Sequence, residues 1–283
     1  MGKLLFRLIL GLLFVGFGLL NYWLNVSPNP VTGEQQRVAL SPEEEVILGR
    51  QGQQEVVSQS GGLHPDSALQ RYIDQIGQRV VQESQASESP YPFEFHVLNN
   101  PDLINAFALP GGQIFITTGL LNELDSEAQL AGVLGHEVGH VVARHGAEHL
   151  ARRQLGAILV NAIGVAASDD LQTGRQAAAI AQAINQLVNL RYGREDELES
   201  DRLGLQFMTA ADYNPQGLVE LMQIFEAAQS AGRPPEFLST HPNPENRVVR
   251  LQEIIQEAYP NGVPSELIEG EQQFAEQIGH NFP

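Results

Sequence analysis

Apolar residues recur at helical spacing over most of this chain, and the first two helices have clear start signals. Ser41-Pro42-Glu43-Glu44 combines a serine cap, a proline at the first helical position and a glutamate at the third, so a helix is expected from here to about Gln59. Asp66 is expected to cap a second helix, whose apolar residues share one face. These residues are Leu69, Tyr72, Ile73, Ile76 and Val80. We interpret both helices as parts of the scaffold.

The hydrophobic period changes to that of β-strands in residues 91–121. Residues 93–97 alternate apolar and polar side chains, which is typical of a strand with one buried face. Two further apolar runs, 105–109 and 113–118, flank the turn signal Pro110-Gly111-Gly112. We therefore expect a small antiparallel sheet. Its free edge either accepts an extended peptide as a further strand or belongs to an ordinary core hairpin, and the pattern is compatible with both.

Ser126–Arg153 follows this sheet and is predicted to form one amphipathic helix. Ser126 and Gln129 have the spacing of a capping box. The apolar residues that follow recur at helical spacing, which places them on one face. They are Leu130, Val133, Leu134, Val138 and Val141.

The same helix contains the motif His136-Glu137-Val138-Gly139-His140. Residues i and i+4 lie about 40° apart on a helix, so both imidazoles can point at one metal ion, as two tetrahedral zinc ligands do. Glu137, about 60° around from His140, can reach a water in the open coordination position without becoming a ligand. H-E-x-x-H on a helix is the pattern of a zinc protease with the glutamate as general base. It also occurs by chance in unrelated helices.

Two further histidines follow the motif. His145 lies nine residues after His136, about 180° around a continuous helix, so it cannot bind the same metal from that helix. Gly146 occupies the place where metzincins have their third histidine. We interpret His145 and His149 as partly exposed residues of the helix surface, and a third ligand must come from another element.

The region after this helix is apolar and then polar. Residues 156–167 form an apolar run interrupted by Asn161, which is too short to span a bilayer. We expect a buried helix or a mobile flap over the cleft. Asp169 or Asp170 is expected to start a further helix through residues 176–190.

Residues 191–208 form a second informative stretch, because their carboxylates have helical spacing. Glu197 and Asp201 lie on one helix face, and Glu195 and Glu199 lie on the opposite side. A glutamate from a second helix commonly completes a two-histidine zinc site, and another carboxylate orients a ligand histidine. Since acidic helix faces are usually solvated, periodicity favours Glu197 only modestly over the Glu195/Glu199 pair.

The last part of the chain is again helical by pattern. Pro215 is expected to start a helix over residues 218–228, and a final helix is expected near residues 245–259. His241 lies in the loop between them, where a lone histidine is more often structural than catalytic. Residues 260–283 have too little apolar content to form a domain.

The N-terminal residues 1–24 are interpreted as a targeting or anchoring segment. Lys3 and Arg7 precede an apolar run over residues 8–20, and no A-x-A-like cleavage site follows. An uncleaved signal anchor is favoured over a cleaved signal peptide, and both place the remainder outside the cytoplasm. Residues 25–40, with two prolines and a glycine, are interpreted as a linker.

Composition excludes several classes of function. The chain of 283 residues has no cysteine, which excludes disulfides, thiolate metal sites and a lipoprotein anchor. Its net charge of −18 argues against nucleic acid as a partner and against electrostatic docking on an anionic membrane. An acidic surface is compatible with a soluble envelope domain.

Four motifs in a fixed order make the chain similar to the HtpX/BepA-type family of zinc endopeptidases, which also includes the CAAX prenyl-protein endopeptidases. The resemblance covers roughly Ser41–Tyr259. The motifs are Asn105-Ala106-Phe107-Ala108-Leu109-Pro110-Gly111-Gly112, His136-Glu137-Val138-Gly139-His140, Arg194 with Glu197-Leu198-Glu199-Ser200-Asp201, and Thr240-His241-Pro242 with Arg247.

The resemblance implies an α+β fold, namely a mostly helical zincin-like metalloprotease domain with a small antiparallel β-sheet beside the motif helix. We expect a signal anchor or signal peptide at residues 1–24, a linker at 25–40, the zinc metallopeptidase domain at 41–259 and a tail at 260–283. The chain has one N-terminal apolar segment at most and only about two dozen residues after the last helix. It thus resembles the compact envelope type rather than the multi-pass or repeat-bearing members.

The resemblance also implies a site with one Zn²⁺ ion per chain. The metal would be held by His136, His140 and Glu197, with Asp201 as the partner just outside the ligand set and Glu137 as the catalytic base.

Three further positions follow from the family pattern. His241 is expected near the open position of the metal, either stabilising the oxyanion or occupying the fourth position at rest. Arg247, Asn105 and Ala106 are expected to line the substrate cleft.

The resulting hypothesis is a zinc-dependent endopeptidase that cuts misfolded or membrane and envelope proteins as part of quality control. Its expected partners are polypeptides and, through residues 1–24, the membrane, but not nucleic acid. The alternative is an envelope chaperone or assembly factor that binds unfolded proteins with little proteolysis.

Overall fold

The computed structural model describes residues 16, 20, 24, 26–153, 186–187, 190–232, 235–242 and 247–279. Among these, no helix is long and apolar enough to cross a membrane. The expected anchor at residues 1–24 lies almost entirely outside the described residues. The apolar run 156–167 lies outside them too, as does most of the helix expected over 176–190.

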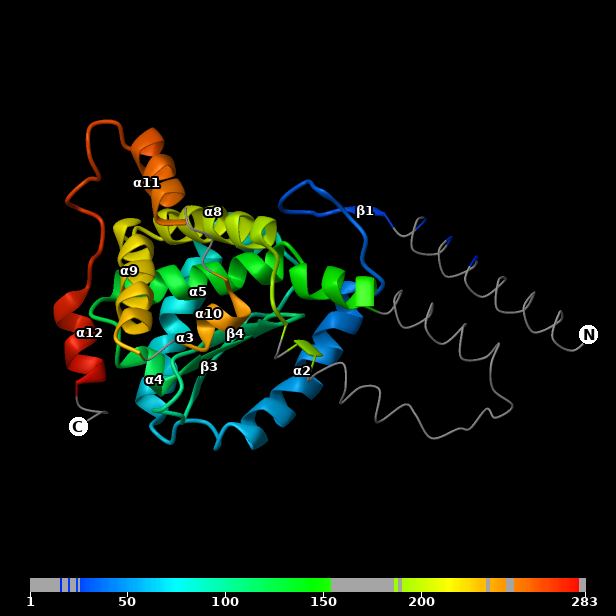
Figure 1. Ribbon diagram of the computed structural model, residues 1–283, viewed down its shortest axis with the longest axis horizontal. Helices are drawn as coiled ribbons and strands as arrows, with labels where there is room; N and C mark the ends of the chain where they lie inside the picture. Colours follow the sequence, from blue (N-terminus) through cyan, green and yellow to red (C-terminus); the bar gives the residue numbers. More distant parts are fainter. Residues whose placement is uncertain are drawn as a thin grey trace, which may run out of the picture.

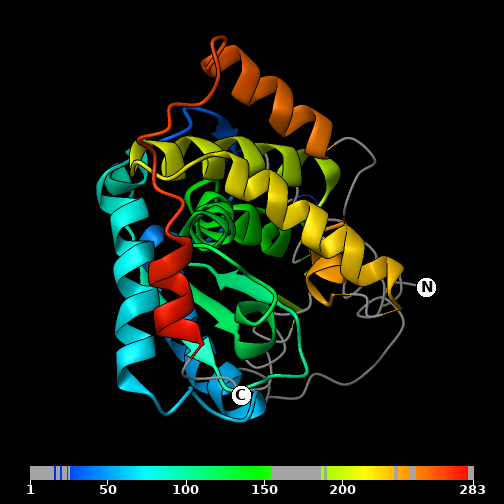
Figure 2. The ribbon, with the colours of Figure 1, turned by 90° about the vertical axis from the view of Figure 1, so that its left-hand side faces the viewer.

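The fold is arranged around helix α5 (Glu127–Val142), all of whose residues are buried. It crosses the centre of the molecule in Figure 1 and is seen end-on in Figure 2. Helices α8 (Arg194–Ala210) and α9 (Gln216–Ser230) contact it on one side. Strand β4 (Ala106–Leu109) and helix α3 (Ser67–Gln82) contact it on others. A helix that is covered all round can be apolar on every face, which agrees with its composition.

The sheet beside α5 has three strands in the order β3-β5-β4. Strands β4 (Ala106–Leu109) and β5 (Gln113–Thr117) form the expected antiparallel hairpin around the turn at Gly111 and Gly112, which both have positive φ. Strand β3 (Glu94–Leu98) pairs with β5 in parallel, so the sheet is mixed rather than purely antiparallel. The crossover between β3 and β4 makes this possible and leaves β5, buried throughout, in the centre.

The two N-terminal scaffold helices are confirmed. Helix α2 (Pro42–Gln59) begins with the Ser41–Glu44 capping box, and α3 begins with Asp66 accepting hydrogen bonds from the first helical backbone amides. A short 3₁₀ helix, η1 (Gln85–Glu88), follows α3.

The segment expected as a linker contains a small hairpin of β1 (Ser27–Pro28) and β2 (Gln35–Gln36). Asn29 and Gln36 are buried and donate from their side chains to the backbone carbonyls of Val142, at 2.7 Å, and Ala143. The last carbonyls of a helix have no intrahelical partner, so this hairpin caps the C-terminal end of α5.

The prediction of one continuous helix over Ser126–Arg153 is wrong. Ser126 caps α5 as expected, but the helix ends at Val142 and helical residues resume only at His145. Arg144, between them, has a φ of 57°. Its guanidinium donates to the buried carboxylate of Glu45 on α2 and to the carbonyl of Leu40, and these distant contacts hold the break.

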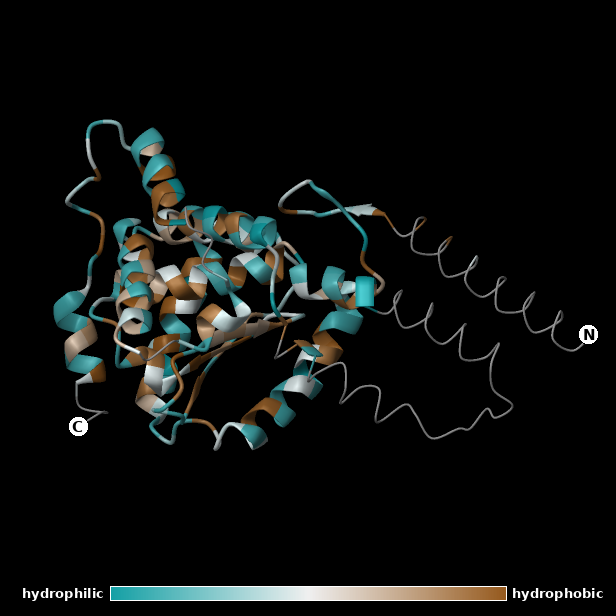
Figure 3. Ribbon diagram, viewed as in Figure 1, coloured by the Kyte–Doolittle hydropathy of each residue, from teal (hydrophilic) through white to brown (hydrophobic). Residues whose placement is uncertain are grey.

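The C-terminal part packs back on the same core. After the short helix α4 (Thr118–Leu121), seen near the sheet, the remaining helices are α10 (Phe237–Thr240), α11 (Arg247–Ala258) and α12 (Glu271–Ile278). Phe274 and Ile278 of α12 are buried against the core, and the carbonyl of Glu269 accepts from the amide of Ala128 at the start of α5. In Figure 3 the strands are largely hydrophobic, whereas α12 alternates polar and apolar residues, as expected of a helix with one exposed face.

Candidate metal centre

His136 and His140 lie one turn apart on α5 and converge. Their Nε2 atoms are 3.0 Å apart, and both side chains are inaccessible to solvent in the middle of the molecule. Two imidazole nitrogens this close need something between them, either a shared proton or a cation. The i, i+4 spacing therefore brings the two imidazoles together, as predicted from the sequence.

Small residues let α8 approach this face of α5. A Cβ atom on Gly204 would lie 2.7 Å from the backbone nitrogen of His136, and one on Gly139 would lie 2.7 Å from Ser200 Oγ. Ser200 also donates a hydrogen bond to the carbonyl of His136. This close contact brings the carboxylates of α8 within reach of the two histidines.

Glu197 faces the histidine pair from α8. Its Oε2 lies 3.5 Å from His136 Nε2 and its Oε1 lies 3.5 Å from His140 Nε2. Asp201, one turn further on, lies 3.0 Å from His136 Nδ1, on the outer side of that ring. Glu195 is exposed, so the pair of carboxylates that turns toward the histidines is Glu197 and Asp201.

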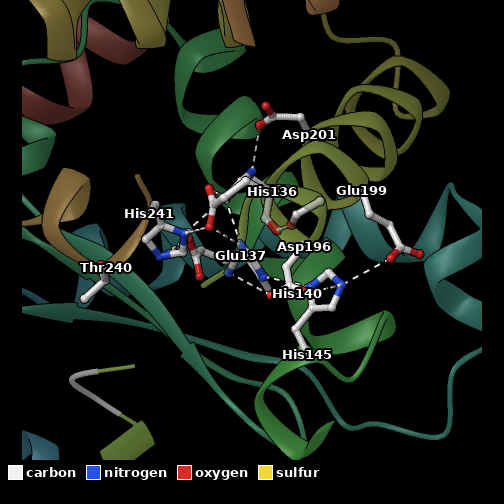
Figure 4. Close-up of polar contacts among 12 residues, drawn as sticks. His136, Glu137, His140, His145, Asp196, Glu199, Asp201, Thr240 and His241 are labelled. Carbon is white, nitrogen blue, oxygen red and sulfur yellow. Dashed lines mark hydrogen bonds and ion pairs between the residues drawn. The ribbon is translucent and has the colours of Figure 1, made fainter. Parts of the chain in front are cut away.

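His241 completes the group from the C-terminal end of α10. Its ring stacks on Phe237 with centroids 4.3 Å apart, and its Nδ1 lies 3.1 Å from Glu197 Oε1 and 3.3 Å from His136 Nε2. One ligand atom from each of four buried residues therefore falls within 4.8 Å of the others. These residues are His136, His140, Glu197 and His241, and the three histidines are labelled in Figure 4.

The donor set and its unpartnered atoms fit a metal ion. Imidazole nitrogens with one carboxylate are the ligands that Zn²⁺ prefers. His241 Nε2 and both carboxylate oxygens of Glu137 are buried without a hydrogen-bond partner. Buried polar groups are rarely left so, and a bound cation with its water would supply the missing partners.

Arg247 lies behind this group at the start of α11 and is 1% exposed. It donates to both oxygens of Asp201, at 2.7 and 2.6 Å, and its Nη1 lies 3.0 Å from Glu197 Oε2. A bidentate guanidinium fixes both the position and the orientation of a carboxylate. Arg247 thus holds two acidic groups in place, and a direct contact with substrate stays a prediction.

Burial and neighbouring charges set the protonation of the acidic groups. Burial raises the pKa of Glu137, and nearby His241 and His136 lower it only in part. Burial acts the same way on Glu197, but His241 and Arg247 outweigh it and hold its pKa well below the usual value. The pKa values of the two glutamates therefore shift in opposite directions. Glu137 is suited to accept a proton, whereas Glu197 stays ionised.

His136 is affected by the same carboxylates. Burial opposes its charged form, but hydrogen bonds with Asp201 and Glu197 raise its pKa to about 9. The pKa of Asp201 is lowered, because Arg247 outweighs the effect of burial.

Asn105 directly precedes β4, Ala106 is its first residue, and both are buried. The backbone amide of Asn105 is bonded to Thr117 Oγ1 at 3.1 Å, while its side-chain oxygen is buried without a partner. Among the described strands, β4 is an edge of the sheet and contacts α5. The position suits a substrate contact, which stays a prediction.

Two residues beside His140 were not found from the sequence. Tyr192 stacks on its ring with centroids 3.9 Å apart. His145, expected to be partly exposed, is 3% exposed and its Nδ1 lies 2.9 Å from His140 Nδ1. That expectation is wrong because it assumed a continuous helix, and the break at Arg144 turns His145 inward. His149 is partly exposed as expected.

Comparison with known proteins agrees with this geometry. The sequence model of peptidase family M48 matches residues 67–255. The chain belongs to peptidase family M48. The resemblance to the HtpX/BepA-type zinc endopeptidases is thereby confirmed.

Relatives of this M48 chain carry protease names. The beta-barrel assembly-enhancing protease of Escherichia coli K12 is 34% identical over 212 residues, which are 73% of this chain and 43% of the relative. The mitochondrial metalloendopeptidase OMA1 of Schizosaccharomyces pombe is 32% identical over 264 residues, 89% of this chain and 73% of the relative. The OMA1 metalloendopeptidase of Bos taurus is 32% identical over 265 residues, with shares of 88% and 49%. The chain spans less than half the length of the bacterial relative.

Proposed function

We propose that this chain is a zinc-dependent endopeptidase that hydrolyses peptide bonds of misfolded or membrane and envelope proteins. The observation that carries the proposal is the buried group of His136, His140, Glu197 and His241 around the unpartnered carboxylate of Glu137. Membership of the M48 family and the protease names of its relatives support it.

In this proposal His136, His140 and Glu197 hold the zinc ion. Zinc, when bound, supplies Lewis-acid chemistry, which lowers the pKa of a water to about 7 and polarises the substrate carbonyl. Asp201 accepts the Nδ1 proton of His136 and so leaves its Nε2 free to act as a ligand. Arg247 keeps Asp201 and Glu197 ionised in a buried position.

Glu137 is proposed as the general base. Its carboxylate is buried and has no hydrogen-bond partner, and burial raises its pKa, so it is a better proton acceptor than an exposed glutamate. It takes a proton from the attacking water as the oxygen bonds to the carbonyl carbon. When the carbon–nitrogen bond breaks, the same carboxyl group passes this proton to the leaving amine.

His241 has two proposed roles. It could donate a hydrogen bond from Nε2 to the oxyanion, since that nitrogen has no partner and lies 3.6 Å from Glu137 Oε1. It could instead occupy the fourth metal position at rest. The approach of Nδ1 to both Glu197 and His136 favours the resting role for the described conformation.

Edge strand β4 offers a place for the substrate. An extended peptide can add to such an edge by backbone hydrogen bonds, and Asn105 and Ala106 at its start are proposed contacts. Residues 1–24 would anchor the chain to the membrane and place the domain outside the cytoplasm. The name of the bacterial relative, which includes β-barrel assembly, supports an envelope role.

The same name also supports the second candidate, a chaperone or assembly factor with little proteolysis. Cleavage of casein or of an unfolded envelope protein, with and without a chelator, separates the two. We expect cleavage that a chelator abolishes and zinc restores.

Glu137→Gln is the decisive variant, because it removes the base but no metal ligand. It should retain zinc and the fold, and lose cleavage by about 10²–10⁴, the usual contribution of a general base. Near-normal turnover in this variant would exclude the mechanism. Glu195→Gln, an exposed change on α8, is the matched control and should cleave normally.

A further inference from the structure

The break after α5 places a second imidazole against the outer side of His140. On a continuous helix, residues five apart point about 140° away from each other. Here α5 ends at Val142, the chain turns through Arg144, and His145 Nδ1 comes to 2.9 Å from His140 Nδ1. The local turn therefore creates a contact that helical geometry forbids.

Several distant residues hold this turn in place. Arg144 has a φ of 57°, a conformation that is unfavourable for a residue with a side chain and persists only where surroundings enforce it. Glu45 accepts from Arg144 Nε at 2.9 Å, and Asn29 and Gln36 cap the carbonyls on either side of the helix end.

The hydrogen atoms on these rings can be assigned from their neighbours. His140 Nε2 faces His136 and Glu197, so it must offer its lone pair if it is a metal ligand. Its Nδ1 then carries the hydrogen, and His145 Nδ1 must accept it. The hydrogen of His145 is left on Nε2, which lies 3.2 Å from the carboxylate of Glu199.

We infer that His145 and Glu199 are positioning residues that select the metal-binding tautomer of His140 and fix the orientation of its ring. The inference rests on the proposed metal site. With this assignment, each step from Glu199 through His145 to His140 has one donor and one acceptor. Figure 4 shows the three side chains. Tyr192, stacked on His140, restricts the remaining rotation of the ring.

The two histidine ligands therefore have different supports. His136 faces a carboxylate directly, since its Nδ1 lies 3.0 Å from Asp201, which is paired with Arg247. His140 reaches its carboxylate, Glu199, through a second imidazole, and that carboxylate is 17% exposed. His145 itself cannot bind the same ion, because it contacts the ring nitrogen that faces away from the group.

Two substitutions separate a tautomer effect from simple packing. His145→Asn places an amide oxygen near the position of Nδ1, so it can still accept from His140. His145→Leu fills similar space but accepts no hydrogen bond. Zinc affinity of the full chain is measured by competition with a chelator, and unfolding is followed without metal to verify the fold.

We expect His145→Leu to bind zinc about 10–100-fold more weakly, the usual loss when the partner of a ligand histidine is removed. His145→Asn should bind close to wild type. His149→Asn is the control, because His149 pairs with Asp196 and does not touch a proposed ligand. Wild-type affinity of His145→Leu, or equal loss in both His145 variants, would overturn the inference.

Glu199 provides a second test if His145→Leu does not fold. Glu199→Leu should weaken zinc binding, whereas Glu195→Leu, one turn earlier on the same side of α8 but exposed to solvent, should not. Equal zinc affinities of these two variants would refute the hydrogen-bond chain from Glu199 to His140 but not the proposed function. If the wild-type chain bound no zinc, the proposed function would fail together with this inference, so the two failures are distinguishable.

Discussion

Glu197 and Asp201 differ from Glu195 in the direction in which α8 points them. The first two are buried against His136, whereas Glu195 is exposed to solvent. A buried carboxylate stays ionised only if cations or hydrogen bonds replace its water, and Arg247 supplies both here. Glu197 and Glu195 are the same residue type, two positions apart on α8, yet only Glu197 is held ionised in a buried position.

Glu197→Gln should lose much of its zinc, because an amide is a poor ligand and leaves Arg247 with less negative charge to balance. Glu195→Gln should keep one zinc per chain. Elemental analysis of the two purified variants decides this. Full zinc content in Glu197→Gln would mean that the third ligand lies elsewhere.

His241→Ala distinguishes the two roles of this histidine. If it donates to the oxyanion, turnover should fall by about 10²–10³ with zinc content unchanged, which is the scale of one lost donor. If it occupies the metal at rest, basal cleavage should rise instead. Unchanged cleavage of every substrate with normal zinc would show that His241 has neither role.

At the scale of elements, the site depends on how closely α5 and α8 approach. Gly135 and Gly139 on α5 face Gly204 and Ser200 on α8, so only the small side chain of Ser200 lies between the two backbones there. One helix supplies the histidines and the other the carboxylates. A change in their separation would therefore alter the metal group without touching any of its members.

Gly204→Ala tests this dependence. The added methyl group would lie 2.7 Å from His136 N and 2.9 Å from Gly135 C, so the helices must move apart. We expect a loss of about 1–3 kcal/mol in unfolding free energy, as for other overpacked cores, together with weaker zinc binding. Gln206→Ala, on the exposed face of α8, is the control and should change stability by less than about 0.5 kcal/mol. Denaturant melts with and without zinc measure both effects.

At the scale of the whole molecule, segments near the two ends of the described chain cap the two ends of α5 by hydrogen bonds. The N-terminal hairpin satisfies the carbonyls of Val142 and Ala143, and the C-terminal segment satisfies the amide of Ala128 through Glu269. Both ends of a buried helix expose backbone groups that water cannot reach. The N-terminal hairpin and the C-terminal segment thus stabilise the helix that carries His136 and His140.

Deletion of residues 1–24 and deletion of residues 1–40 should therefore differ. The shorter deletion removes the proposed anchor and should give a soluble, folded domain. The longer deletion also removes the hairpin, and each buried carbonyl left without a partner costs about 1–3 kcal/mol. We expect a clearly lower thermal midpoint for the longer deletion, measured at equal zinc. Equal midpoints would show that the hairpin does not stabilise α5.

The sequence by itself determined the features that depend on near neighbours. The caps at Ser41, Asp66 and Ser126, the hairpin turn and the i, i+4 spacing of His136 and His140 all involve residues within about four positions. Such interactions depend little on the rest of the chain, so the sequence pattern was sufficient to predict them. The family resemblance, carried by four motifs, added Glu197 as the expected third ligand.

Only the tertiary structure decided the features that depend on distant residues. The break at Arg144 is held by Glu45, 99 positions away, and the inward turn of His145 follows from it. Periodicity left open which carboxylates of α8 face inward, and burial against α5 selected Glu197 and Asp201. Strand β3 pairs in parallel with β5 because of a crossover that no local pattern specifies. In each case the deciding contact joins segments whose separation in the sequence exceeds the reach of backbone propensity.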